Sequence, residues 1–264
     1  MISIIYLFSL ILFYCNGFNN QFPIVSYTKK FNNLKDINVV EPKYTSKSNT
    51  SCVIFFTGGS SFIIPEIYND FMMNLVYNNI AVYTPSFRYE KINDLVNILN
   101  NKYKEVVIAG HSSGGSTAIN NCNNKIINKL ILIDPVKNNI FRNNYNLNFI
   151  ESVLFLNAEK SYKISYEPFG LPFIPFFRIS RNELSPTKNC KILSVNANNY
   201  GHSDILDKPF ANMMHKTRIS VGNKNRSYGN LNKYHNWMGN IINNFIKNKY
   251  NNLNYLNKIN NTII

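Results

Sequence analysis

The sequence predicts an α/β protein with a mostly parallel, doubly wound sheet and helices on both of its faces. Short, apolar, β-branched runs recur along the chain, and segments of helical length separate them. Near-continuous hydrophobicity is typical of strands that are buried on both faces. The regular alternation of strands and helices favours a parallel sheet. The candidate functional residues all follow the carboxyl ends of these runs, where open α/β sheets bind ligands.

Six apolar runs are expected to form the strands of this sheet. Their hydrophobicity is continuous rather than alternating, so neither face of the sheet is expected to be exposed to water. In chain order, the expected strands are 52–57, 80–84, 105–109, 129–133, 152–156 and 191–195.

Segments between and after these runs carry apolar residues at helical spacing. In 91–101, for example, Ile92, Leu95 and Leu99 fall on one side of a helix. The last such segment follows the i, i+3, i+4, i+7 rule over 231–246, so a long amphipathic helix is expected to close the domain. The expected helices are 66–78, 91–101, 116–122 and 231–246.

Length and composition predict one domain, expected over 46–248, followed by a low-complexity tail, 249–264. The chain has 264 residues, of which 45% are hydrophobic. Its 28 Lys and Arg residues against 14 Asp and Glu give a net charge of +14. The lysines are scattered, and the sequence contains no recognisable nucleic-acid-binding module or basic stripe. The charge therefore predicts no nucleic-acid partner and at most weak contact with an anionic membrane surface.

The N-terminus predicts translocation into the secretory pathway. Residues 1–14 are almost entirely apolar, and the small residues Cys15 and Gly17 lie at the two positions that a signal peptidase inspects. A signal peptide over 1–17 is therefore expected, and an uncleaved signal anchor is the alternative. Residues 18–45 form an Asn- and Lys-rich leader that resembles a transit peptide, so transport onward to a plastid is one possible destination.

Cysteine usage gives no sign of a disulfide framework or of a metal site. Without the expected signal peptide, three cysteines remain, and an odd number argues against a set of paired disulfides. Cys52 and Cys190 border apolar runs, which favours buried thiols. The sequence contains no C-x-x-C pair and no His-rich cluster, so no metal is expected.

The most informative motif is Gly110-His111-Ser112-Ser113-Gly114, directly behind an apolar run. A serine that attacks a carbonyl must stand out of the sheet on a tight turn, and flanking glycines allow that turn. The strand before the motif and the helix-compatible segment after it are typical of a nucleophile elbow, with Ser112 as the nucleophile. The alternative is a glycine-rich turn that binds phosphate. That alternative lacks the lysine of a phosphate-binding loop.

A nucleophilic serine needs a base that titrates near neutrality, which is most often histidine. Of the four histidines, His111 adjoins the serine and is expected to point elsewhere, while His235 lies in the expected closing helix. His202 lies in a loop behind the last expected strand, the usual position of the base in enzymes with this elbow. His202 is therefore the predicted base, and His215 is the competitor.

The third catalytic group must be a carboxylate that holds the imidazole in one tautomer. In chain order it is expected between Ser112 and His202. Asp134, the only aspartate in that interval, directly follows the expected strand 129–133. From the residues alone, Glu159 behind the next strand is a rival, and an Asp-Pro turn without a catalytic role is a further interpretation of Asp134.

The oxyanion that forms on attack needs two backbone N–H donors that are already in place. One predicted donor is the amide of Ser113, directly after the nucleophile. The other is expected in the glycine-rich segment behind the first strand. Gly59 is the predicted donor in that segment, and Gly58 is the alternative.

Three segments of the chain resemble the chlorophyllase group of α/β-hydrolases, which is related to the platelet-activating-factor acetylhydrolase and dienelactone hydrolase types. They are G-H-S-S-G-G at 110–115, L-I-L-I-D-P-V at 130–136 and Y-G-H-S-D-I-L-D at 200–207. The resemblance spans 52–207 and implies the α/β-hydrolase fold. It also implies that the aspartate of the D-P-V segment, Asp134, is the acid of the triad.

The chain departs from that group at positions near the elbow. Ser113 stands where the group usually has Arg, Thr57 stands where it has His before the glycine, and Lys137-Asn138 replaces the acidic and glycine residues that often follow D-P-V. These changes leave the predicted triad complete and leave the alcohol part of the substrate open.

A proline-interrupted aromatic segment, 167–177, lies between the predicted acid and base. Such a segment forms neither a good helix nor a good strand, so we expect a loop near the carboxyl ends of the strands. We expect Phe173 and Phe176 to line an apolar channel for a long acyl or isoprenoid chain. Simple packing of this loop under the closing helix is the alternative.

Together, these residues predict a serine carboxyl-ester hydrolase that acts on a hydrophobic ester through an acyl-enzyme and needs no cofactor. A phospholipase, an acetylhydrolase or a thioesterase with the same triad is an alternative. From a different class of function, a non-catalytic lipid-binding module on the same fold is a further alternative.

Overall fold

The computed structural model describes residues 24–29, 37–59, 63–86, 91–138, 144–162, 178–186, 189–216 and 227–251. The expected signal peptide, the aromatic segment with Phe173 and Phe176, and most of the expected tail lie outside the described residues.

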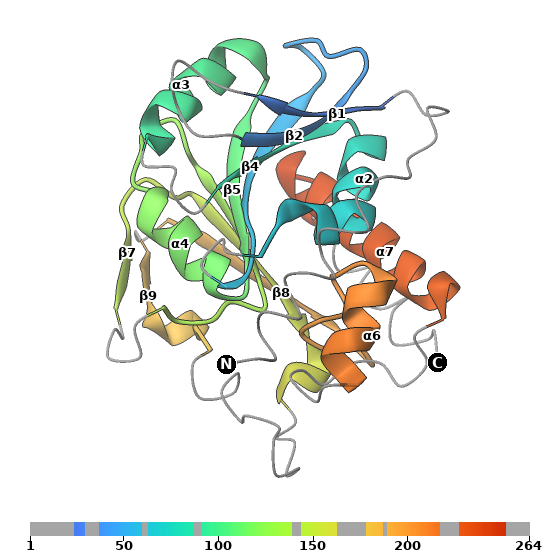
Figure 1. The fold of residues 1–264 in the computed structure, drawn as a ribbon. Coiled ribbons are helices and arrows are strands. Elements are labelled where there is room, and N and C mark those ends of the chain that lie inside the picture. The colour runs from blue at the N-terminus through green and yellow to red at the C-terminus, as the bar shows by residue number, and fades with distance from the viewer. Residues whose placement is uncertain are drawn as a thin grey trace.

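Within the described part of the chain, eight strands form one sheet in the order β1-β2-β4-β3-β5-β6-β8-β10 (Figure 1). The second strand, β2, runs antiparallel to its neighbours β1 and β4, and every other neighbouring pair is parallel. The mostly parallel sheet of the prediction is therefore confirmed. The strands are β1 (Ile24–Lys29), β2 (Ile37–Pro42), β3 (Ser51–Phe56), β4 (Ile80–Pro85), β5 (Val106–His111), β6 (Lys129–Ile133), β8 (Ser152–Ala158) and β10 (Lys191–Ala197).

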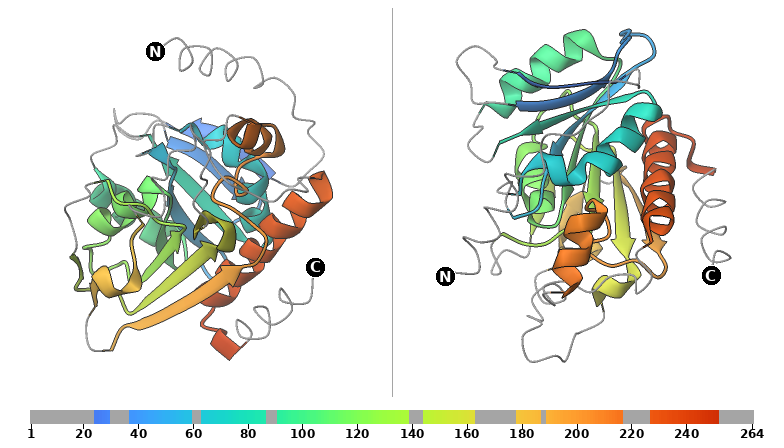
Figure 2. Two further views of the ribbon diagram at one scale, coloured as in Figure 1. Left: turned by 90° about the horizontal axis from the view of Figure 1, so that it is seen from below. Right: turned by 45° about the vertical axis from the view of Figure 1, so that its right-hand side comes forward.

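Helices cover both faces of the sheet. The helices α3 (Ile92–Lys102) and α4 (Ser113–Asn121) pack on one face. The other face is covered by α2 (Asn69–Tyr77), α6 (Lys208–Lys216) and α7 (Tyr228–Ile246). Figure 2 shows α7 and α4 on opposite sides of the strands. Shorter elements are the 3-10 helices η2 (Pro65–Tyr68), η3 (Glu159–Tyr162) and η4 (Arg181–Glu183) and the paired strands β7 (Tyr145–Leu147) and β9 (Leu184–Pro186).

Alternating side chains of the central strands feed two separate hydrophobic clusters. In β3, Val53 and Phe55 belong to the cluster under α2 and α7, whereas Ile54 and Phe56 belong to the cluster under α3 and α4. Successive side chains of a strand point to opposite faces, so a strand covered on both faces must be apolar throughout. This is the physical reason for the continuous apolar runs in the sequence.

The domain begins earlier than the predicted boundary at residue 46. Both β1 and β2 come from 18–45, the segment that we expected to be a leader, and they pair with the sheet. Ile37 and Val39 of β2 are fully buried in the core. Polar asparagines and lysines dilute this segment, so its apolar residues do not form a continuous run that marks a strand.

The remaining expected elements are present, with shifted ends. The strand before the elbow continues through His111, and the elbow helix begins at Ser113 rather than at residue 116. The segment expected as one helix over 66–78 divides into η2 and α2, and the short helix α6 was not predicted.

Cys52 and Cys122 are buried, and the three cysteines of the described residues are free thiols. Cys190 is partly exposed, which corrects the expectation that its thiol is buried. It directly precedes β10, which is the edge strand of the sheet and has β8 as its one neighbour in the sheet order.

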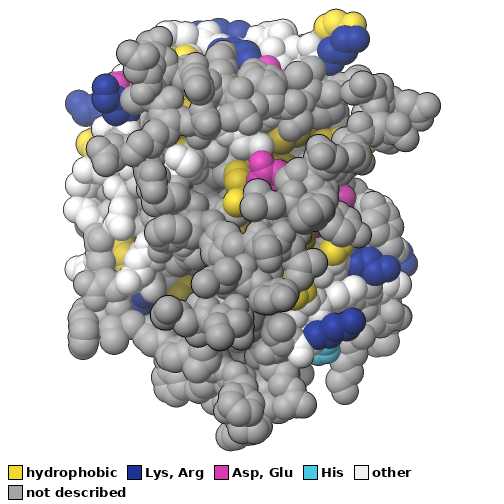
Figure 3. Space-filling view, viewed as in Figure 1, with side chains coloured by type: hydrophobic (Ala, Val, Ile, Leu, Met, Phe, Trp, Pro, Cys, Tyr) yellow, Lys and Arg dark blue, Asp and Glu magenta, His cyan; other side chains and the backbone are white. Residues whose placement is uncertain are grey.

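Two observations concern possible contact with a membrane. On the face drawn in Figure 3, the described Lys and Arg side chains lie at separate points and do not form one patch. In the part of the chain that the structure describes, no helix has the length and apolar character needed to span a membrane.

Candidate active site

The backbone around Ser112 forms a sharp turn between β5 and α4 that only glycine neighbours permit. A Cβ atom added at Gly110 would lie 2.1 Å from the carbonyl oxygen of Gly114. A Cβ atom added at Gly114 would lie 2.2 Å from the carbonyl oxygen of Phe56. Real Cβ atoms do not approach backbone oxygens so closely, so glycine is required at both positions for steric reasons.

Ser112 itself has a strained backbone, with φ of 56° and ψ of −131°. Among the described residues, the other non-glycine residues with positive φ are Asp134 and three asparagines, the residue type that best tolerates this conformation. Such strain typically costs about 1–3 kcal/mol and persists where surrounding structure enforces it. Here the Ser112 amide donates to Ile133, and the Ser112 carbonyl accepts from Val136 at 2.8 Å.

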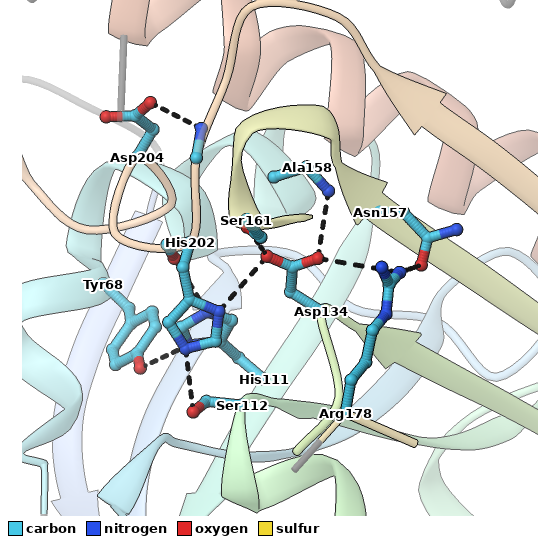
Figure 4. Close-up of polar contacts among 11 residues, drawn as sticks. Tyr68, His111, Ser112, Asp134, Asn157, Ala158, Ser161, Arg178, His202 and Asp204 are labelled. Atoms are coloured by element: carbon cyan, nitrogen blue, oxygen red, sulfur yellow. Dashed lines mark hydrogen bonds and ion pairs between the residues drawn. The ribbon is translucent and has the colours of Figure 1, made fainter. Parts of the chain in front are cut away.

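The structure brings the predicted serine, histidine and aspartate into one hydrogen-bonded chain (Figure 4). The distance from His202 Nε2 to Ser112 Oγ is 2.9 Å, and that from His202 Nδ1 to Asp134 Oδ2 is 3.2 Å. Asp134 and His202 are buried, with 3% and 8% of their surface exposed, whereas Ser112 is partly exposed. The Ser112 hydroxyl thus lies at the solvent end of an otherwise buried chain.

Asp134 is held as an ionised carboxylate by its surroundings. Its Oδ1 accepts from the Ala158 amide at 3.0 Å and lies 3.9 Å from Arg178 Nη2, while Ser161 Oγ donates to its Oδ2. Burial disfavours the charged form, but the hydrogen bond and charge of His202, the Ser161 hydroxyl and Arg178 outweigh it. Together they hold the pKa of Asp134 below its ordinary value.

The ionised state of Asp134 fixes the proton positions on His202. A carboxylate can only accept hydrogen bonds, so the contact at His202 Nδ1 requires an N–H donor there. In the neutral ring, Nε2 then carries the lone pair and faces the Ser112 hydroxyl. This is the arrangement that a general base for a serine nucleophile requires.

Glu159 contacts the backbone of the loop that carries His202 rather than the His202 ring. Its Oε2 accepts a hydrogen bond from the Asn199 amide at 3.1 Å. Between the two candidate acids, Asp134 is therefore the one bonded to the His202 ring. Asp134 directly follows β6, whereas Glu159 is the first residue of the 3-10 helix after β8.

The two other histidines weighed as bases lie on the helices α7 and α6. His235 is fully buried in α7, and its Nε2 donates to the carbonyl oxygen of Asp204. Because burial is the largest influence on this ring, the pKa of His235 is lowered to about 4. His215 is an exposed residue in the last turn of α6.

The glycine loop behind β3 lies directly against Ser112. A Cβ atom added at Gly58 would lie 3.3 Å from the Ser112 Cβ. The Gly58 amide donates to the Tyr68 hydroxyl at 3.0 Å, and the Gly58 carbonyl accepts from the Ile63 amide at 3.4 Å. Gly58 therefore has its own partner, and the carbonyl contact also fixes the peptide plane that carries the Gly59 N–H.

Two features of this loop were not evident in the sequence. Thr57 closes the loop, because its hydroxyl donates to the Ile63 carbonyl at 2.6 Å. Gly59 has a positive φ of 58°, which its lack of a Cβ makes possible.

Sequence reasoning missed the residues that support the predicted triad. Ser161 and Arg178 contact Asp134, and Tyr68 and His111 contact the glycine loop and the His202 backbone. No spacing rule joins these positions, because each lies on a different element. The described residues contain no group of three or more His, Cys, Asp and Glu side chains arranged to hold a metal ion.

Comparisons with known proteins give a structural likeness. A hyperthermophilic esterase from the archaeon Pyrobaculum calidifontis matches with a TM-score of 0.54 and 12% identity, over 92% of each chain. The chain has the α/β-hydrolase fold. An arylesterase matches with a TM-score of 0.51 and 11% identity, over 91% of this chain and 92% of that chain. No known protein family and no curated protein matches the sequence.

Proposed function

We propose that the protein is a serine carboxyl-ester hydrolase. The observation that carries this proposal is the chain of hydrogen bonds from Ser112 Oγ through the His202 ring to Asp134, at the end of a strained strand–turn–helix elbow. In this role Ser112 is the nucleophile, His202 is the general base and acid, and Asp134 orients the imidazole.

In the first half of the reaction, Ser112 Oγ attacks the carbonyl carbon of the ester. Its proton passes to His202 Nε2, a new carbon–oxygen bond forms, and the carbonyl electron pair moves onto the oxygen. Asp134 stabilises the imidazolium that results. When the tetrahedral intermediate collapses, the bond to the alcohol breaks, and the departing oxygen takes the proton from His202 Nε2. The product is an acyl-enzyme on Ser112.

The negative oxygen of the intermediate needs donors that are already in place. We assign this role to the backbone amides of Gly59 and Ser113. The fixed Gly58–Gly59 peptide plane and the contact of Gly58 with Ser112 support the choice of Gly59. The Gly58 amide is committed to Tyr68, which argues against it as the donor.

In the second half, water takes the place of the alcohol. His202 Nε2 accepts a proton from water as the water oxygen attacks the acyl carbon, and the same proton returns to Ser112 Oγ as the acid leaves. No group outside the three residues, the two amides and water is required.

The labelling experiment that tests this function uses a fluorophosphonate probe, which reacts with activated serines. We expect the full-length protein to be labelled at Ser112 and the Ser112→Ala variant to remain unlabelled. Absence of label on correctly folded wild-type protein would exclude a serine hydrolase and favour the non-catalytic lipid-binding alternative.

We further propose a hydrophobic ester with a long acyl or isoprenoid chain as the substrate, because the proline-interrupted segment 167–177 is rich in aromatic residues. Phe173 and Phe176, which lie outside the described residues, are the proposed channel lining. A series of p-nitrophenyl esters of increasing chain length, extended to phytyl esters and phospholipids, tests this point. If Phe173→Ala and Phe176→Ala leave the chain-length profile unchanged, the channel proposal is wrong.

Translocation into the secretory pathway is a separate proposal from the sequence. It predicts that the mature protein begins at Phe18. N-terminal sequencing of the protein from its native source tests this, and retention of Met1 would favour an uncleaved signal anchor.

A further inference from the structure

A second chain of hydrogen bonds runs beneath the serine–histidine–aspartate chain and shares no side chain with it. The Gly58 amide donates to the Tyr68 hydroxyl at 3.0 Å. The Tyr68 hydroxyl lies 2.8 Å from His111 Nδ1, and His111 Nε2 lies 3.0 Å from the His202 carbonyl oxygen. The chain thus begins at the glycine loop and ends on the backbone of the proposed base.

Elementary rules of hydrogen bonding fix the direction of every bond in this chain. The carbonyl of His202 can only accept, so His111 Nε2 must carry a proton. In a neutral ring His111 Nδ1 then carries the lone pair, so Tyr68 must donate its hydroxyl proton to it. The Tyr68 oxygen remains free to accept from the Gly58 amide, which is the contact observed.

Burial keeps this chain in one protonation state. Tyr68 is fully buried, and His111 has 3% of its surface exposed. Burial, followed by the charge of His202, lowers the pKa of His111 to about 3, so the ring is neutral near neutral pH. Burial also raises the pKa of Tyr68, so its hydroxyl keeps its proton. A buried polar group without a partner is costly, so the four groups favour this one arrangement.

The chain joins the loops on either side of the nucleophile. Gly58 belongs to the loop after β3, Tyr68 ends η2, His111 ends β5, and His202 lies in the loop after β10. The rings of His111 and His202 are also in contact, with centroids 4.7 Å apart and planes tilted by 36° (Figure 4). The His111 ring therefore contacts both the ring and the backbone carbonyl of His202.

We propose that Tyr68 and His111 are positioning residues, which hold the glycine loop and the His202 loop at fixed places on either side of Ser112. The proposal rests on the proposed hydrolase function, because it assigns these two residues a part in presenting the base and the oxyanion donors. Neither residue contacts Ser112 Oγ by a hydrogen bond in the chain described above; each acts through Gly58 or His202. Small displacements of reacting groups reduce rate strongly while affecting binding less.

Three variants and one control test the proposal by steady-state kinetics on a p-nitrophenyl ester. Tyr68→Phe removes only the hydroxyl and keeps the ring packing against Phe55. His111→Leu removes both ring nitrogens, whereas His111→Gln keeps an N–H donor for the His202 carbonyl. The control, Tyr103→Phe, removes another buried tyrosine hydroxyl on the opposite side of the sheet.

We expect kcat to fall about 10- to 100-fold in Tyr68→Phe and in His111→Leu, with KM within about 2-fold of wild type. The His111→Gln variant should regain most of the kcat that His111→Leu loses. The Tyr103→Phe variant should keep the wild-type kcat. Equal kcat losses in Tyr68→Phe and Tyr103→Phe would overturn the proposal, because they would indicate general destabilisation. Wild-type kcat in folded Tyr68→Phe would overturn it too.

A spectroscopic measurement separates this proposal from the proposed function. Side-chain 15N NMR of the histidines in the wild-type protein should show His111 protonated at Nε2 and bare at Nδ1, with the His202 signals shifted in Tyr68→Phe. If the protein shows this protonation pattern but the fluorophosphonate probe does not label Ser112, the hydrolase function is refuted. The hydrogen-bonded chain through Tyr68 and His111 would still stand. A proton on His111 Nδ1 in wild type would refute the positioning chain itself.

Discussion

Two polar clusters of the described residues use the same kinds of bond but differ in purpose. One is the candidate site at the carboxyl end of β5. The other, which we call the Glu41 cluster, contains Glu41, Tyr83, Lys102 and Tyr103. Lys102 Nζ lies 2.6 Å from Glu41 Oε2, and the hydroxyls of Tyr83 and Tyr103 are 3.0 Å apart.

Backbone strain distinguishes the two clusters. Ser112 and Asp134 both have positive φ values, whereas none of the four residues of the Glu41 cluster does. In the Glu41 cluster, the polar groups bond one another and tie β2 to β4 and to the end of α3. In the candidate site, the chain of bonds ends on a partly exposed hydroxyl. The comparison teaches that polar hydrogen bonds alone do not mark a candidate site, because backbone strain is what sets the candidate site apart from the Glu41 cluster.

The largest expected effect is that of removing the proposed nucleophile. Ser112→Ala should lower kcat for ester hydrolysis by about 10⁶-fold, because the covalent step is lost. The hydrolysis rate is measured beside a denaturant unfolding curve, with Tyr103→Phe from the Glu41 cluster as the control. A residual rate within about 10-fold of the wild-type rate would show that Ser112 is not the nucleophile.

The second effect separates the two carboxylates near His202. Asp134→Asn should reduce kcat by about 10⁴-fold, since the amide stabilises the wrong tautomer of the base. Glu159→Gln should stay within about 10-fold of wild type, because Glu159 contacts the Asn199 backbone rather than the ring. The reverse ranking in the same assay would make Glu159 the acid.

The third effect concerns the glycines that permit the strain. Gly114→Ala should destabilise the fold by about 3 kcal/mol or more, because the new methyl group meets the Phe56 carbonyl oxygen. Gly229→Ala, in the first turn of α7, is the matched control, since a Cβ there meets nothing within 4 Å. It should stabilise by about 0.5–1 kcal/mol. Urea unfolding measures both, and equal effects would contradict the steric argument.

The fourth effect is a dependence of stability on pH that comes from His111. The folded-state pKa of His111, about 3, lies below its ordinary value, so the unfolded chain binds the proton first as pH falls. The stabilisation is complete above about pH 6.5 and is lost as pH falls toward about 3.

His111→Gln should therefore lose less stability than wild type between about pH 7 and pH 4, by an amount on the order of 3 kcal/mol. His215→Gln, at an exposed position in α6, is the control and should follow wild type. Parallel curves of unfolding free energy against pH for wild type and His111→Gln would show that His111 is not buried in its neutral form.

The smallest effect tests the Glu41 cluster itself. Tyr103→Phe should reduce the free energy of unfolding by about 2 kcal/mol, because the Glu41 carboxylate loses a donor, while kcat/KM stays at the wild-type value. Burial, followed by the hydrogen bond to Glu41, raises the pKa of Tyr103, so this hydroxyl remains protonated. If kcat/KM falls while the free energy of unfolding stays unchanged, the Glu41 cluster contributes to catalysis.

Particular residues show how far sequence reasoning reached. The run before Gly110 and the small residues after Ser112 predicted the elbow, because the requirement is local: a side chain at Gly110 would meet Gly114, only four residues away. The central strands were predicted by the same kind of argument, since burial on both faces demands continuous apolar runs. By contrast, β2 was missed, because its six residues include polar Asn38 and Glu41.

What the sequence by itself determined is therefore the fold class, the position of the elbow and the small set of residues able to complete a site there. Steric demands of neighbouring residues and the two-residue period of strands act over short stretches of chain, so they can be read directly. Only the tertiary structure placed Asp134 rather than Glu159 beside His202 and joined Tyr68 to His111. Those contacts link residues far apart in the chain, and the stacking order of the strands decides which of them meet.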